Sequence, residues 1–126
     1  MKDYEVKTSV LFDTGFSDGE CNCLMFDGMK EKIVGDIKAA FESDKQLAEN
    51  ITSDMTFRFP GYKARVEYTF SCYDENEAEA ESFSRNCLRA IEEKLQEQGY
   101  RMEKVTCKAG EMDMGWLDRL EGMWFG

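Results

Sequence analysis

The residues Lys63-Ala64-Arg65-Val66-Glu67-Tyr68-Thr69-Phe70-Ser71-Cys72 decide the fold of this 126-residue chain. Apolar side chains occupy every even position of this stretch, which is the two-residue period of a strand with one buried face. From Ala80 onward the period becomes helical. The apolar stripe of this second segment consists of Phe83, Cys87, Leu88, Ile91 and Leu95. The stretch therefore predicts a strand that leads directly into a long amphipathic helix.

Both ends of this helix are marked in the sequence. Asn76 is a typical N-cap residue, and Glu79 follows it at the third helical position. Gly99 suits the left-handed conformation that commonly stops a helix. We therefore expect the helix to end just before Gly99, with Tyr100 folded back onto Leu95.

The same two periods predict the other elements. Alternating apolar residues predict strands over residues 4–12, 55–59 and 105–109, and a helical stripe predicts a helix over residues 29–41. A capping box that begins at Ser43 predicts a short helical turn after it. Residues 59–62 place proline and glycine as a type II turn requires, which makes the second and third strands a hairpin. Residues 13–28 have no sustained period, so we expect a long loop there.

The element order is therefore β-α-β-β-α-β, within one α+β domain over residues 1–126. It predicts the ferredoxin-like split βαβ fold, a four-stranded antiparallel sheet with two helices on one face. The first and third strands are the longest and are expected at the centre. Residues 111–126 are rich in Met, Trp, Leu and Phe. We expect them to form a C-terminal hydrophobic clasp, or else a dimer contact or a partner-binding tail.

The amino-acid composition limits the classes of function that the chain can have. The chain contains 26 acidic and 16 basic residues, a formal net charge of -10, which disfavours adhesion to DNA or anionic membrane and favours a basic partner. No apolar run approaches bilayer length, and the first residues have the pattern of a strand, so a cytoplasmic location is expected. The absence of histidine excludes Ser-His and Cys-His catalysis and histidine-ligated metals. We expect a non-enzymatic protein without a cofactor or metal.

Carboxylates crowd the start of the long helix. Anions there offset the helix macrodipole and keep the surface soluble, which accounts for them without any function. Alternatively, a rigid helix that presents carboxylates competes for a surface built to hold phosphates. The candidate acidic contacts are Asp74, Glu75, Glu77, Glu81 and Glu93, together with Asp18 and Glu20 in the loop. The candidate hydrophobic contacts are Trp116, Trp124 and Phe125.

The sheet face that the helices leave open is an alternative site for nucleic acid or another ligand. Its basic residues are expected to be Lys7, Arg58, Lys63, Arg65, Lys104 and Lys108. RNA-recognition domains share this topology and stack bases on aromatic residues of the central strands. The corresponding positions here are Ser9, Glu67 and Thr69, so direct nucleic-acid binding is not expected.

Two short motifs suggest other chemistry. Cys21 and Cys23 form the third alternative, a thiol or metal site, although zinc requires about four ligands and acidic neighbours disfavour a thiolate. The other three cysteines are expected to be reduced and packed in the core. Residues 12–15, Phe-Asp-Thr-Gly, resemble the active-site triplet of aspartic proteases, but that family is almost wholly β. Aspartate and glycine are also good turn formers.

Small acidic proteins encoded by phages and mobile elements, anti-CRISPR inhibitors among them, are similar to this chain in size, charge and lack of catalytic residues. That resemblance implies an inhibitor whose carboxylates occupy a basic nucleic-acid channel on another protein. We therefore expect a small acidic binding protein that docks onto a basic macromolecular partner as a nucleic-acid mimic. A homodimer through the C-terminal segment is an additional expectation.

Overall fold

The computed structural model describes residues 2–16 and 22–111, and for residues 22 and 23 only the backbone. The elements in chain order are β1 (Lys2–Asp13), α1 (Asn22–Ser43), α2 (Lys45–Asn50), β2 (Thr56–Arg58), β3 (Lys63–Asp74), α3 (Glu77–Glu97) and β4 (Arg101–Glu111). All strand pairs are antiparallel. The predicted α+β class with a four-stranded antiparallel sheet is confirmed.

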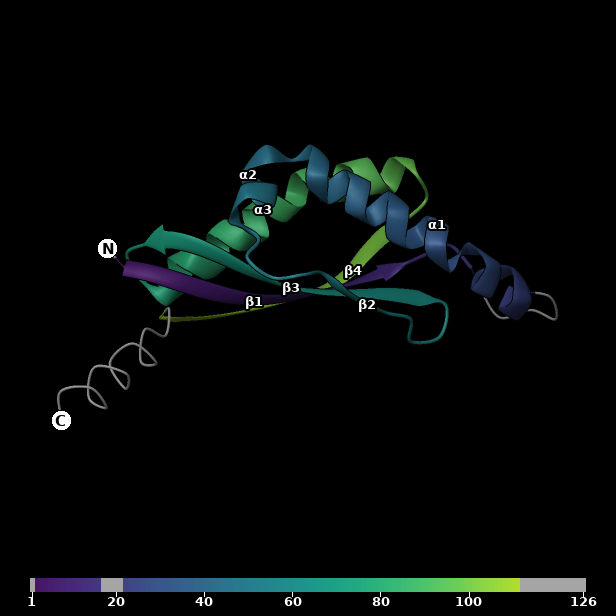
Figure 1. Ribbon diagram of the computed structural model, residues 1–126, viewed down its shortest axis with the longest axis horizontal. Helices are drawn as coiled ribbons and strands as arrows, with labels where there is room; N and C mark the ends of the chain where they lie inside the picture. The colour runs from purple at the N-terminus through teal and green to yellow at the C-terminus, as the bar shows by residue number, and fades with distance from the viewer. Residues whose placement is uncertain (1, 17–21, 112–126) are drawn as a thin grey trace, which may run out of the picture.

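The order of strands across the sheet is β2-β3-β1-β4, so the two longest strands are central. β1 and β3 pair over twelve residues, from Lys2 opposite Asp74 to Asp13 opposite Lys63. Figure 1 shows α1, α2 and α3 on the same side of this twisted sheet. No element within residues 2–16 and 22–111 covers the other side of the sheet, which we call the open face. In the described part of the chain, no helix is long and apolar enough to cross a membrane.

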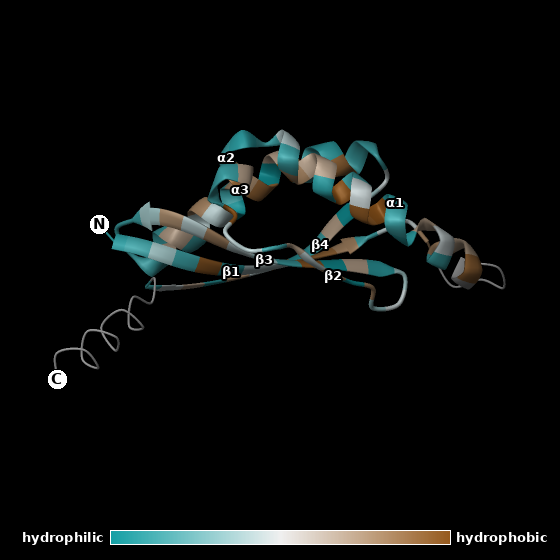
Figure 2. Cartoon of the chain, in the orientation of Figure 1, coloured by the Kyte–Doolittle hydropathy of each residue, from teal (hydrophilic) through white to brown (hydrophobic). Residues whose placement is uncertain are grey.

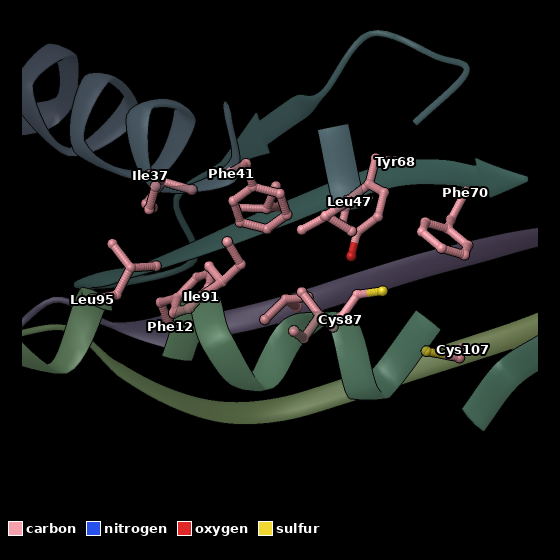
Figure 3. Close-up of a cluster of buried hydrophobic side chains, with 14 of the residues drawn as sticks. Phe12, Ile37, Phe41, Leu47, Tyr68, Phe70, Cys87, Ile91, Leu95 and Cys107 are labelled. Atoms are coloured by element: carbon pink, nitrogen blue, oxygen red, sulfur yellow. The ribbon is translucent and has the colours of Figure 1, made fainter. Parts of the chain in front are cut away.

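The core lies between the sheet and the helices because the strands have one apolar face. Even-numbered residues of β1 and β3 point inward, and Val6, Val10, Val66 and Phe70 are fully buried. Hydrophobic and hydrophilic segments alternate along the strands in Figure 2. Figure 3 shows side chains from the sheet meeting side chains from all three helices. The labelled members of this core include Phe12, Tyr68 and Phe70 from the strands and Ile37, Leu47, Ile91 and Leu95 from the helices.

The ends of α3 are capped as the sequence predicts. The Glu79 amide donates to the Asn76 side-chain oxygen at 2.9 Å. At the other end Gly99 has a φ of 94°, in the left-handed region that favours glycine. The Tyr100 amide then donates to the carbonyl of Leu95 at 2.9 Å, which is the hydrogen bond of a glycine-terminated helix.

The predicted loop over residues 13–28 is wrong in its second half, because α1 begins at Asn22. Phe26 explains the early start. It lies seven residues before Ile33, continues the buried stripe of α1, and is only 3% exposed. Its ring packs edge-to-face against Phe59 at 5.7 Å and Tyr62 at 5.5 Å. Tertiary packing therefore overrides the weak helical signal of the Gly28 region.

The N-cap predicted at Ser43 lies one residue later, at Asp44. The Leu47 amide donates to the Asp44 side chain at 3.0 Å and starts α2. The Ser43 hydroxyl instead donates to the Ala40 carbonyl at 2.6 Å, near the end of α1. Two adjacent residues therefore divide the roles of ending one helix and starting the next.

Phe83 is less buried than its place in the predicted stripe suggests. It is half-buried at the rim of the core, while Ser84 beside it is fully buried. The Phe83 ring still contacts Phe70, with ring centroids 5.4 Å apart.

Truncation of these two rings should have unequal effects. Phe70→Ala should lower the free energy of unfolding by about 3–5 kcal/mol because it leaves a cavity under α3. Phe83→Ala should cost distinctly less, because part of its ring already lies in water. Urea denaturation of both variants measures the difference. Equal losses would show that Phe83 belongs to the core as fully as Phe70 does.

A polar tether joins α1 to the end of α3. The Tyr100 hydroxyl donates to Asp36 at 2.7 Å, and Lys32 forms an ion pair with the same carboxylate oxygen at 2.8 Å. The hydrogen bond from Lys32, followed by that from Tyr100, holds the pKa of Asp36 below its ordinary value despite an opposing effect of desolvation.

The tether should make stability depend on pH. A carboxyl whose pKa is lowered on folding stabilises the protein above its unfolded pKa of about 3.9, and this contribution is lost as the pH falls through the folded pKa. Asp36→Asn should therefore lower the melting temperature at pH 7, and the difference should vanish in strong acid. Glu31→Gln, at an exposed carboxylate of the same helix, is the control. A pH-independent deficit in Asp36→Asn would contradict the prediction.

Candidate functional site

Four carboxylates gather where β3 meets α3, and we call them the acidic corner: Asp74, Glu75, Glu77 and Glu79. Glu75, Glu77 and Glu79 are exposed. Desolvation, the charge of Glu75 and a hydrogen bond to Asp74 raise the pKa of Glu79 above its ordinary value. The corner therefore concentrates negative charge at one end of the helix. Glu79 belongs to it although it was not among the candidate contacts.

Glu81 has a different role from the acidic corner. Its carboxylate accepts a hydrogen bond from the backbone amide of Ala109 at 2.9 Å, in a partly buried position. Ala109 lies on β4, an edge strand, so this amide has no strand partner on that side. The candidate contact at Glu81 is thus engaged in holding α3 to the edge of the sheet.

Glu93 is exposed but lies far from the acidic corner. Sixteen residues of helix separate it from Glu77, which corresponds to about 24 Å along the axis. The exposed side chains of Arg85 and Arg89 lie between them in the chain. The negative charge on α3 is therefore concentrated at its N-terminal end rather than continuous along one face.

Several candidates lie outside the described residues. These are Asp18, Glu20, Cys21, Trp116, Trp124 and Phe125, and with the last three all of the C-terminal clasp except Glu111, which is the last residue of β4. Cys23 lies in the first turn of α1, without a described side chain. The thiol or metal alternative at Cys21 and Cys23 therefore stays a prediction.

The open sheet face is hollowed along β1. Three hollows of about 320, 420 and 230 Å³ lie over it in succession. Hydroxyl side chains of Ser9, Thr69 and Thr106 line them, and Lys7, Arg65, Lys104 and Lys108 are the basic lining residues. Glu5, Glu67 and Glu111 line the hollows as well, so the face offers cations interspersed with carboxylates above small polar groups.

One end of the open face is neutralised internally. Lys63 and Glu103 form an ion pair at 2.6 Å, and Arg101 lies 3.5 Å from Glu103 and 3.9 Å from Asp13. A register shift of β4 opposite Leu11 and Phe12 brings Glu103 into this group. Lys63, a candidate basic residue of the open face, is therefore already paired.

The described thiols are packed in the protein interior. Cys87 and Cys107 are buried and Cys72 is half-buried, and none forms a disulfide. Burial, as the first cause, raises the pKa of the Cys72 and Cys87 thiols. Among the residues that the structure describes, no group of three or more Cys, Asp or Glu side chains is arranged to hold a metal ion.

A small polar cluster lies beside these thiols. The hydroxyls of Thr8 and Ser84 are 3.1 Å apart, and Thr8 approaches Cys107 at 3.8 Å. The buried Tyr68 hydroxyl, shown near Cys87 in Figure 3, has no hydrogen-bond partner within the described residues. Desolvation raises the pKa of Tyr68 strongly. The cluster lies in the core, where a substrate has no access.

The Phe-Asp-Thr-Gly motif forms a turn. The Gly15 amide donates to the Asp13 side chain at 2.9 Å, and Gly15 has a φ of 84°. The Thr14 hydroxyl donates to the Tyr62 carbonyl. This is the turn geometry that aspartate and glycine favour.

Comparison with known proteins does not place the chain in a family. No protein-family model matches the sequence, and no curated protein matches it.

The hydrogen bond of Glu81 can be tested directly. Glu81→Ala should speed hydrogen exchange of the Ala109 amide and lower the free energy of unfolding by about 1–3 kcal/mol, because a partly buried donor loses its acceptor. Glu81→Gln keeps a side-chain oxygen and should have a smaller effect. Unchanged exchange at Ala109 in Glu81→Ala would show that the bond contributes nothing to stability.

Proposed function

We propose that this protein is a small non-enzymatic binding protein that docks onto a basic protein partner through its acidic corner. The supporting observation is the distribution of charge. Residues 22–54 and 74–97, which contain all three helices, carry 15 acidic and 7 basic residues. The helix layer thus accounts for most of the net negative charge of the molecule, and its exposed carboxylates are densest at the corner.

The most specific form of the proposal is a nucleic-acid mimic of the anti-CRISPR type. Closely spaced carboxylates on a rigid helix end resemble the repeated charges of a phosphate backbone. Desolvation, followed by the neighbouring carboxylates Glu75 and Asp74, raises the pKa of Glu79. A partner that binds nucleic acid through lysine and arginine would respond to this array, and the protein would occupy the channel as a competitor.

We also assign the domain to the ferredoxin-like split βαβ fold, with α2 as an addition to the β-α-β-β-α-β order. The support is the element order together with the placement of the helices on one side of the sheet. This assignment leaves the opposite face of the sheet open for a second role.

The decisive variant is Glu75→Gln/Glu77→Gln/Glu79→Gln. Because electrostatic attraction acts mainly on encounter, this variant should slow association with the partner more than it speeds dissociation, and binding should weaken steeply with salt. A pull-down from the native cells identifies the partner, and stopped-flow kinetics with that purified protein supply the rates. The partner is expected to be basic and to bind nucleic acid.

The matched control is Glu31→Gln/Glu42→Gln/Glu49→Gln. It removes three exposed carboxylates from α1 and α2, so it changes net charge equally but spares the corner. Equal slowing by both variants would mean that only net charge matters. A partner that binds both variants as fast as wild type would refute the acidic corner as the docking site.

A further inference from the structure

The open sheet face carries five basic residues that the proposed function does not use. We call them the cationic patch: Lys7, Arg58, Arg65, Lys104 and Lys108. In the described part of the chain none of them forms an ion pair. Of the 26 acidic residues of the chain, 15 lie in residues 22–54 and 74–97, which contain the helices on the other side of the sheet.

The register places like charges directly opposite each other. Lys7 is paired with Lys108 across β1 and β4, and Arg58 with Arg65 across β2 and β3. Like charges directly opposite each other destabilise a sheet. The fold does not require this repulsion, and an anionic partner would relieve it.

The three hollows join into one furrow along β1. The hollows of about 320 and 420 Å³ share Lys7 and Lys108, and those of about 420 and 230 Å³ share Ser9, Glu67 and Thr106. From Glu5 to Leu11 the furrow is about 20 Å long. It is open to solvent, so it suits an extended chain lying along it better than a small molecule, which needs enclosure.

The cations stand at two positions along this furrow. Lys7 and Lys108 mark the first, and Arg65 and Lys104, both paired with Leu11, mark the second. Four residues of strand separate the two positions, which is about 13 Å. An extended peptide has the same rise and the same two-residue period, so its side chains i and i+4 would meet both positions.

The position between them is not cationic. Ser9 lies there between Glu67 and Thr106. A uniform phosphate chain would meet the Glu67 carboxylate, whereas a peptide can place a polar or basic residue at i+2. The patch has no aromatic side chain on which bases could stack. These features favour a peptide over a nucleic acid.

We propose that the cationic patch binds an extended acidic segment of a protein partner, with carboxylates at positions i and i+4 and a polar or basic residue at i+2. Recognition is through side chains rather than strand addition. On the edge strand β4 the Ala109 amide is already engaged by Glu81, and the other edge strand, β2, is only three residues long. The cationic patch is separate from the acidic corner, and the proposal made for it does not depend on the proposed function.

The probe is a fluorescein-labelled peptide with glutamates at i and i+4 and lysine at i+2, measured by fluorescence anisotropy at low salt. Lys7→Gln/Lys108→Gln should weaken its binding about fivefold, from two surface charge contacts of a few tenths of a kcal/mol to 1 kcal/mol each. Arg85→Gln/Arg89→Gln is the matched control, because it removes two exposed charges from α3. The affinity of this control variant for the peptide should differ from that of wild type by less than twofold.

A second peptide of the same composition, with glutamates at i and i+3, places its carboxylates on opposite faces of an extended chain and should bind distinctly more weakly. Amide chemical shifts of wild-type protein should change along β1 and at Lys104 to Lys108, a measurement that needs no variant. Equal binding of both peptides, or equal weakening by both double variants, would overturn the proposal. Tighter binding of an oligothymidylate than of the peptide at the same patch would also overturn it, in favour of nucleic acid.

Discussion

The twelve-residue pairing of β1 with β3 is the constraint on which the rest of the structure depends. Its register places Val6 beside Phe70 and Val10 beside Val66 on the inner face. Because side chains alternate, a slip of one residue would move this whole set to the solvent side. The same register fixes the outer face, since Lys7 and Arg65 occupy odd positions. Core and surface are thus determined by one set of hydrogen bonds.

The sheet separates two surfaces of opposite local charge. The helix layer carries the acidic corner, and the open face carries the cationic patch. A helix is about 10 Å across, while the Debye length at physiological salt is about 8 Å. Each surface is therefore largely screened from the other, which allows an acidic protein to retain cations that form no ion pair within the described residues. A partner that contacts one face responds to local charge rather than to the net charge of -10.

The elements with clear periods could be predicted from the sequence, because the period and the caps are local. This holds for β3 and for α3 from Asn76 to Gly99. The start of α1 is not apparent from the sequence because Gly28 and the acidic residues around it interrupt the apolar stripe. Phe26, seven residues before Ile33, was the signal that marked it. Features that depend on tertiary packing or on strand register could not be predicted from the sequence.

The candidate site likewise has some features with local sequence signals and others that depend on tertiary packing. The sequence located the acidic start of α3 and the basic open face. It could not show that Glu81 reaches Ala109, which depends on how α3 packs beside β4. The pairing of Lys63 with Glu103 depends on the register shift in β4, which no local sequence pattern predicts. From the sequence, Glu81 and Lys63 look free to contact a partner. In the structure each already has a partner within the protein.

The two edge strands determine whether a partner can bind by adding a strand to the sheet or only by contacting one of its faces. An unprotected edge strand of eleven residues would invite backbone pairing with another chain. Here Glu81 occupies one outward amide of β4, the register shift interrupts its pairing line, and Lys104 and Lys108 add charge along it. At the other edge, β2 is too short to template a long partner strand. Strand addition is therefore disfavoured at both edges, and the faces are what a partner can contact. Binding through either face depends on side-chain charge, so both interactions proposed for this protein should weaken with salt while the fold, held by the apolar core, does not.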